Sequence, residues 1–149
     1  MSIVDIRQIF FDEREKVKNF LDNAGDSLSS FRYFKTRTSD AIKGHVATFL
    51  GYNNHGAVVY GHLDKDTKEN KLWLGICTSE KQRGRGFGKQ MMIQLIKTFN
   101  KQTEYDVLYL MVDEENVGAI SLYTKFGFVN ISNHNDKCRM VLKKETHNG

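Results

Sequence analysis

Three consecutive segments decide the fold of this chain: KLWLGICT at residues 71–78, QRGRGFGKQMM at 82–92 and YDVLYLMVD at 105–113. The first and third are short apolar runs of the kind that form buried strands. Between them, apolar residues recur at helical spacing, with Lys and Gln on the opposite side: Phe87, Met91, Met92, Leu95, Ile96 and Phe99. A strand, a helix of this length and a second strand predict a right-handed crossover that joins two parallel strands.

Further strands are expected on both sides of this unit. HVATFLGY at 45–52 and GAVVYGHL at 56–63 precede residues 71–78 with short turns between them, which predicts an antiparallel meander. FVNI at 128–131 and KCRMVLKK at 137–144 predict two final strands.

The remaining elements are two shorter helices and a first strand. A strand is expected around residues 3–9, then a helix that starts in a capping box of Asp12 and Glu15 and stops at Gly25. A short helix after the third segment has Asn116 as its cap and Gly127 at its end. The resulting order is β α, β β β, α β, α β β. It predicts an α/β (α+β) domain with a mixed, mostly antiparallel central sheet flanked by helices.

The composition limits both the organisation and the function of the chain. With 149 residues, it suits one domain over residues 1–149, with 145–149 as a frayed tail. The start lacks the features of a secretory signal and no apolar run is long enough for a membrane span, so we expect a cytoplasmic protein without a membrane partner. Cys77 and Cys138 form no ligand motif, so no metal site is predicted. The net charge of +4 lacks a long basic block and favours small anionic ligands over nucleic acid; it also disfavours polyamines.

The glycine stretch at the start of the central helix predicts an anion site. A helix N-terminus exposes unpaired N–H groups and a partial positive charge. No Ser, Thr, Asp or Asn stands at the expected cap position, the glycines let a ligand approach the backbone, and Arg83, Arg85 and Lys89 add positive charge. A glycine-rich turn without a ligand is the alternative.

Two other phosphate-binding motifs fit this stretch less well. A P-loop would need glycine at the position of Arg83 and Ser or Thr at that of Gln90. A dinucleotide-binding motif that starts at Gly84 would need glycine in place of Lys89, although Asp113 lies at a suitable distance for a ribose-binding acid.

Two motifs together resemble the GNAT superfamily of N-acetyltransferases. Arg-x-x-Gly-x-Gly from Arg83 resembles the pyrophosphate loop of that family, and NVGAISLYTKFGF at 116–128 is similar to its second signature. The resemblance covers residues 72–130 and implies a sheet whose fourth and fifth strands, 71–78 and 105–113, splay into a V.

The resemblance also implies a binding mode for acetyl-CoA as co-substrate. The pantetheine arm would pair with the edge of the fourth strand at Leu74, Ile76 and Thr78, and an N–H near Ile76 would polarise the thioester carbonyl. The pyrophosphate would meet the backbone of the loop: Arg83, Gly84, Arg85, Gly86, Phe87, Gly88 and Lys89. Asn116 contacts the coenzyme in some relatives, although a plain helix cap is an equal alternative.

Catalytic roles follow from the chemistry of acyl transfer to an amine. The resemblance makes Tyr123 the acid that protonates the departing thiolate, and a phenol with a pKa of about 10 is protonated at neutral pH. His62 is the candidate base because its intrinsic pKa is about 6.5. Other candidates are His45, Asp113 and Glu114.

Two further expectations concern the route of acetyl transfer and the surface through which the protein would form a homodimer. Cys77 lies near the expected thioester and would allow an acyl-cysteine, but the resemblance favours direct transfer in a ternary complex. A homodimer through a sheet edge or the last strands is possible.

The acceptor is sought in the first half of the chain. SFRYFKTR at 30–37 interleaves aromatic and basic residues, which suits a nucleotide-linked amino sugar, although an amphipathic segment with buried rings has the same pattern. A looser likeness to bacterial amino-sugar N-acetyltransferases favours an amino-sugar acceptor. The alternatives are a protein N-terminal acetyltransferase of the ribosomal-alanine type and a non-catalytic acyl-CoA or nucleotide-binding module.

Overall fold

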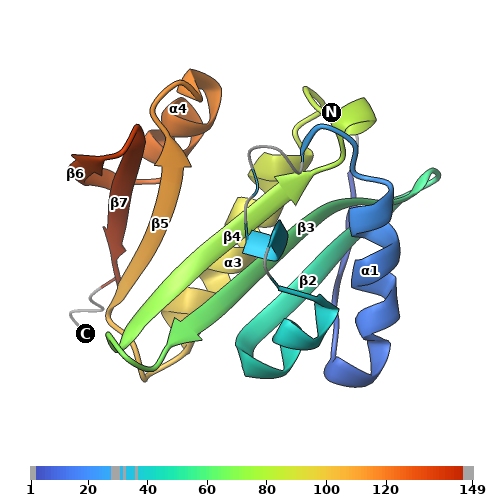
Figure 1. Cartoon of the computed structure of the whole chain (residues 1–149), viewed down its shortest axis with the longest axis horizontal. Helices are drawn as coiled ribbons and strands as arrows, with labels where there is room; N and C mark the ends of the chain where they lie inside the picture. The colour runs from blue at the N-terminus through green and yellow to red at the C-terminus, as the bar shows by residue number, and fades with distance from the viewer. Residues whose placement is uncertain (1–2, 28–30, 32, 36, 146–149) are drawn as a thin grey trace.

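The computed structural model describes residues 3–27, 31, 33–35 and 37–145. These residues form one seven-stranded sheet in the order β1-β2-β3-β4-β5-β7-β6. Helix α1 lies in front of the sheet in Figure 1 and helix α3 lies behind it. The predicted mixed sheet with flanking helices is therefore confirmed.

The bounds of the elements follow the sequence pattern closely. The first half contains β1 (Asp5–Gln8), α1 (Arg14–Asp22), β2 (His45–Asn53), β3 (Gly56–Asp66) and β4 (Lys71–Thr78). The second half contains α3 (Phe87–Lys101), β5 (Val107–Asp113), α4 (Val117–Lys125), β6 (Val129–His134) and β7 (Lys137–Lys143). Short 3₁₀ turns occupy Phe11–Glu13, Tyr33–Lys35, Ser39–Gly44 and Glu80–Gln82.

The start of the first helix differs from the prediction. Residues Phe11–Glu13 form a 3₁₀ turn, and α1 begins only at Arg14. Glu13 Oε1 accepts a hydrogen bond of 3.3 Å from the N–H of Phe10. The box expected from Asp12 and Glu15 is therefore wrong, because the chain enters the helix through the tighter turn.

Strands β4 and β5 form the V that the resemblance implied. They are parallel neighbours only at Leu72↔Leu108 and Trp73↔Tyr109. Beyond Trp73 the two strands diverge, as Figure 1 shows, and β5 continues in register with β7 up to Asp113. Within the described part of the chain, the β5-facing edge of β4 has no ladder partner from Leu74 to Thr78. Peptide groups along this edge are open to an extended ligand.

Alternate residues of β3 enter two different cores. On the α3 side, Gly61 makes room for Met91, whose Cγ lies 2.6 Å from the position of a Cβ built on this glycine. On the α1 side, the ring of Tyr60 stacks on Phe20 with a centroid distance of 6.3 Å. Because side chains alternate along a strand, His62 and Asp64 share the α1 side with Tyr60. Below, this side of the sheet is called the front face.

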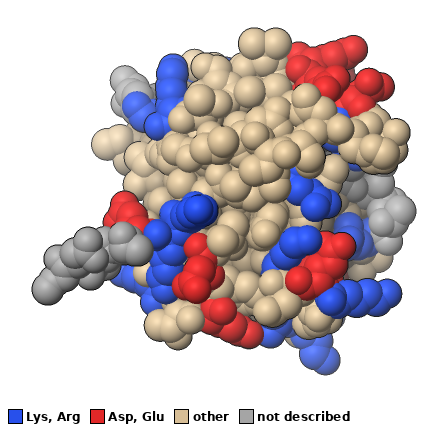
Figure 2. All heavy atoms as spheres, turned by 90° about the vertical axis from the view of Figure 1, so that its left-hand side faces the viewer, with Lys and Arg blue, Asp and Glu red and all other residues tan. Residues whose placement is uncertain are grey.

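On the side where β6 and β7 lie, basic and acidic side chains surround a broad uncharged area (Figure 2). Edge strand β6 is exposed along its whole length, and the expected homodimer stays a prediction. Among the described residues, every helix is too short or too polar to span a membrane.

Candidate active site

The glycine loop before α3 has the conformation that its sequence suggests. Gly84 and Gly86 have φ values of 76° and 82°, in the left-handed region that favours glycine. Gly86 is the N-cap of α3 and no side chain caps the helix. The side chain of Phe87 is buried in the core, so this residue offers only its backbone, whereas Arg85 and Lys89 are exposed.

A second turn braces this loop from the side of α1. The guanidinium of Arg83 donates two hydrogen bonds to Ser27 Oγ, of 3.0 and 2.7 Å. Glu80 Oε2 accepts a hydrogen bond of 3.0 Å from the N–H of Asp26. Arg83 is thus hydrogen-bonded to its own chain although it is exposed, and the exposed Arg85 and Lys89 add positive charge at the helix start.

Three elements converge at the wide end of the V. A Cβ built on Gly88 lies 3.5 Å from Thr78 Oγ1 of β4 and 3.9 Å from Leu122 Cδ2 of α4. The next residue of α4, Tyr123, is buried, and burial raises the pKa of its phenol to about 12, with a smaller contribution from Cys77. The phenol is therefore close enough to Cys77 of β4 for the two groups to interact electrostatically, and it is protonated at neutral pH.

Asn116 caps helix α4. Its Oδ1 accepts a hydrogen bond of 3.1 Å from the N–H of Ala119. The predicted cap is confirmed, and a contact with the coenzyme stays a prediction.

His62 lies on the front face but is closed off from solvent. Its side chain is 2% exposed, and its Nδ1 is 2.6 Å from Tyr60 Oη. The ring covers the backbone of β4 at Gly75, where a built Cβ would be only 2.3 Å from Nε2. Burial, followed by the nearby His45 and Arg37, holds the pKa of His62 well below 6.5. The imidazole is therefore neutral at pH 7.

Beside His62, a chain of hydrogen bonds ends at the carboxylate of Asp64. Tyr33 Oη donates to Asp64 Oδ2 at 2.9 Å and lies 2.7 Å from His45 Nε2. His45 Nδ1 lies 2.8 Å from Thr48 Oγ1. Since the Tyr33 proton goes to Asp64, His45 must donate from Nε2 and accept from Thr48 at Nδ1.

The electrostatics of this chain agree with that tautomer. Burial, with a smaller effect of Arg37, lowers the pKa of His45 to about 4, so the imidazole is neutral. Burial and the neighbouring Asp64 raise the pKa of Tyr33, which keeps its phenol protonated. Burial also raises the pKa of Asp64 above 3.8, although the hydrogen bond from Tyr33 opposes this effect.

The two other base candidates, Asp113 and Glu114, lie away from the cluster of Tyr33, His45 and Asp64. Asp64 faces Trp73 in the β3–β4 ladder, and Trp73 faces Tyr109 at the narrow end of the V. Asp113 and Glu114 lie at the far end of β5, where the N–H of Glu114 donates to the backbone oxygen of Asp136.

The sequence analysis did not identify Tyr33, because the irregular segment that carries it has no periodicity to show which way its ring points.

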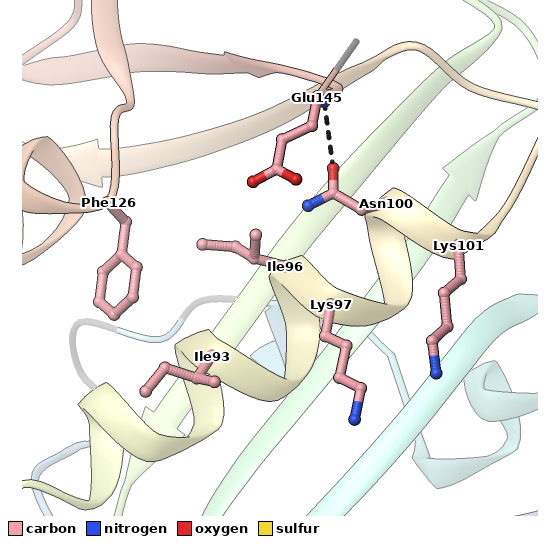
Figure 3. A pocket seen from close by; sticks show the side chains of 7 residues that line it. All are labelled: Ile93, Ile96, Lys97, Asn100, Lys101, Phe126 and Glu145. Atoms are coloured by element: carbon pink, nitrogen blue, oxygen red, sulfur yellow. Dashed lines mark hydrogen bonds between the residues drawn. The ribbon is translucent and has the colours of Figure 1, made fainter. Parts of the chain in front are cut away.

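Two cavities lie outside the V. One, of about 380 Å³, is lined by α1 and the segment after it: Lys18, Leu21, Asp22, Phe31, Phe34, Arg37, Thr38 and Ser39. The other, of about 410 Å³, is a groove beside α3 (Figure 3) that is lined by Ile93, Ile96, Lys97, Asn100, Lys101, Phe126 and Glu145. Asn100 accepts a hydrogen bond there from the N–H of Glu145 at 3.3 Å. The described residues contain no group of three His, Cys, Asp or Glu that could hold a metal ion.

Comparison with known proteins decides the family. Residues 3–128 match the sequence profile described as the acetyltransferase (GNAT) family. The chain belongs to the GNAT family. This GNAT enzyme is an N-acetyltransferase, and acetyl-CoA is its co-substrate.

Individual relatives agree with this assignment. The chain is 29% identical over 133 residues to a spermine/spermidine N(1)-acetyltransferase from Bacillus subtilis, covering 84% of this chain and 87% of that protein. A GNAT-family acetyltransferase from Streptococcus pneumoniae has the same fold, with a TM-score of 0.77 at 18% identity over 95% of this chain and 99% of that one. The putative acetyltransferase yncA from Salmonella typhimurium, solved with acetyl-CoA, gives 0.73 at 15% identity over 99% and 98%.

Proposed function

We propose that this GNAT enzyme transfers the acetyl group of acetyl-CoA directly to the primary amine of a small acceptor, in a ternary complex. The observation that carries this proposal is the divergence of β4 and β5 beside the glycine loop, with the phenol of Tyr123 close to Cys77 of β4. This arrangement offers a free strand edge, unpaired N–H groups and a proton donor at the same end of the sheet.

The coenzyme would occupy the V along β4. Its pantetheine amides would pair with the free edge from Leu74 through Ile76 to Thr78, and the N–H near Ile76 would polarise the thioester carbonyl. Its pyrophosphate would accept hydrogen bonds from backbone N–H groups between Gly84 and Lys89, near the exposed Arg85 and Lys89 side chains.

The reaction needs one proton to leave the amine and one to reach sulfur. The neutral amine attacks the thioester carbonyl carbon, a C–N bond forms, and collapse of the tetrahedral intermediate breaks the C–S bond. Tyr123 donates its proton to the departing thiolate. Because burial raises the pKa of Tyr123 to about 12, the phenol holds this proton at neutral pH until the C–S bond breaks.

For the proton acceptor we propose Asp64 in place of His62. His62 is enclosed, because Nδ1 is bonded to Tyr60 and Nε2 covers Gly75. Asp64 is half-buried and belongs to the next front-face pair of the same ladder. Tyr33 orients the carboxylate by its hydrogen bond of 2.9 Å, which leaves the second carboxylate oxygen for an ammonium group or a water relay.

An amino sugar or a nucleotide-linked amino sugar is the acceptor class that we favour. The cavity of about 380 Å³ presents the rings of Phe31 and Phe34 with Arg37 and Lys18, which suits a planar base and a phosphate. Arg37 also stacks on Tyr33, with its Cζ 4.4 Å from the ring centroid, so this cavity adjoins the Asp64 cluster. Of the segment 30–37, Ser30, Arg32 and Thr36 lie outside the described residues.

A polyamine is the second candidate acceptor. It is favoured by the similarity to the Bacillus subtilis spermine/spermidine enzyme and disfavoured by the net charge of +4. Membership of an enzyme family leaves the non-catalytic binding module without support.

Release of free coenzyme A thiol by the purified protein tests the proposal. Acetyl-CoA is offered with amino sugars, nucleotide-linked amino sugars, spermidine or peptides that have a free N-terminal alanine. We expect turnover with small amines, and a fall in kcat of about 100- to 10,000-fold in Tyr123→Phe with unchanged acetyl-CoA affinity.

Tyr105→Phe removes a phenol from another buried tyrosine and is the matched control. Turnover with peptides alone, or full activity in Tyr123→Phe, would contradict the proposal.

A further inference from the structure

A row of oppositely charged and aromatic side chains crosses the front face at the narrow end of the V. Asp64 faces Trp73 in the ladder of β3 and β4. The ring of Trp73 lies 5.4 Å from that of Tyr109 on β5, and Arg139 of β7 reaches over Trp73 with its Cζ 5.3 Å from the ring centroid. Trp73 therefore lies between the carboxylate of Asp64 and the ring of Tyr109, and the guanidinium of Arg139 lies over it.

The charge of Arg139 is not neutralised within the described part of the chain. No carboxylate pairs with its guanidinium there, and no hydrogen bond from it is found; its contact is the face of Trp73. The side chain is nevertheless only partly exposed. A partly exposed guanidinium over a ring, with N–H donors that no carboxylate of the described residues occupies, suits a planar or tetrahedral oxyanion.

The second cation of this region is already paired. Lys71 lies over Tyr109, with Nζ 5.4 Å from the ring centroid, but its Nζ also binds Glu69 Oε2 at 3.1 Å. On the other side of Trp73, Asp64 receives the hydrogen bond from Tyr33. Among the described residues, Arg139 is thus the unpaired cation over the rings of Trp73 and Tyr109, and Asp64 is the anion beside them.

We infer that the acceptor carries an anionic group, a phosphate or a carboxylate, in addition to its amine. Arg139 binds the anionic group while Asp64 holds the ammonium, and Trp73 lies beside both side chains. This inference rests on the proposed acetyl transfer and narrows its acceptor. It disfavours unmodified polyamines, because a second ammonium group would meet Arg139.

Pairs of acceptors that share an amine and differ in an anionic group test whether the site recognises that group. Glucosamine 6-phosphate is compared with glucosamine, alanine with alaninamide, and spermidine is tested beside them. The wild-type enzyme should prefer one anionic member over its neutral partner by about tenfold or more in kcat/KM, and the preferred pair shows whether phosphate or carboxylate is recognised.

Variants of Arg139 test whether this residue is responsible. Arg139→Gln should raise KM for the anionic acceptor about ten- to hundredfold and leave its neutral partner within about twofold. Arg139→Lys keeps the charge without the planar fork and should lose only part of the preference. Lys143→Gln, at an exposed position on the same strand, is the control.

Three results overturn the inference. These are equal wild-type rates within every pair, spermidine as the best acceptor, or an equal loss for both members of a pair in Arg139→Gln. If spermidine is the best acceptor, the proposed transfer stands and only the inference fails. Absence of thiol release with every acceptor, together with no acetyl-CoA binding, overturns both.

Discussion

Replacing Gly75 with alanine tests how His62 is packed against β4. A Cβ at this position would lie 2.3 Å from His62 Nε2 and 2.5 Å from Cε1, so the ring must move. The ring has little freedom, because it is hydrogen-bonded to Tyr60 at 2.6 Å and its centroid lies 4.3 Å from that of Tyr33. Overpacking costs about 1–3 kcal/mol. A buried hydrogen bond that breaks costs about 1–3 kcal/mol more.

The expected loss of about 2–6 kcal/mol corresponds to a fall in Tm of roughly 4–24 °C for a domain of this size. Thermal denaturation followed by circular dichroism measures it. Gly118→Ala is the matched control, since a Cβ there meets no atom within 4 Å and lies in helix α4. That variant should gain about 0.5–1 kcal/mol.

A double-mutant cycle identifies the cause of the loss. If the clash with His62 is responsible, Gly75→Ala should cost much less in a His62→Ala background than in the wild type. Gly75→Ala with the same Tm as the wild type, or an equal loss in both backgrounds, would refute the packing of His62 on β4. Loss of turnover at a temperature where Gly75→Ala is folded would further show that this packing positions the front face for catalysis.

Three further predictions follow from buried and strained groups. The pKa of His45 is about 4 in the folded protein and 6.5 in an unstructured chain, and the pKa of His62 is lowered by folding as well. Between pH 6.5 and pH 4 the unfolded chain therefore binds more protons than the folded protein. The free energy of unfolding should fall as the pH drops through this window. Urea midpoints near pH 7 and pH 5 should differ less in His45→Gln than in the wild type, and an unchanged difference would contradict the prediction. Burial raises the pKa of Cys77 to about 12, so its thiol should resist alkylation in the native state. Cys77→Ala should retain turnover within about twofold. An acetyl-cysteine detected by mass spectrometry would contradict direct transfer. Gly86→Ala, at a φ of 82°, should cost about 1–2 kcal/mol and weaken acetyl-CoA binding measured by calorimetry, whereas Gly44→Ala should change neither.

Much of the site at the wide end of the V could be predicted because its signals are local. Left-handed glycines, a missing cap and an apolar face that begins at Phe87 are properties of one short stretch, and the structure shows Gly84 and Gly86 in that conformation. The cap at Asn116 is equally local, since its partner Ala119 is three residues away. The hydrogen bonds from the Arg83 guanidinium to Ser27 could not be predicted, because these two residues approach each other only in the folded chain.

The sequence alone determined the order of the elements, the first residue of each meander strand and the glycine loop, since these depend on periodicity and on the backbone freedom of single residues. The tertiary structure decided which polar groups meet on the front face. Tyr33, His45 and Asp64 come together because strand register and a 3₁₀ turn bring distant segments into contact. The same holds for Arg139 and Trp73, which belong to strands on opposite sides of β5. Periodicity shows which face of a strand a residue occupies, but only packing between elements shows what lies across from it.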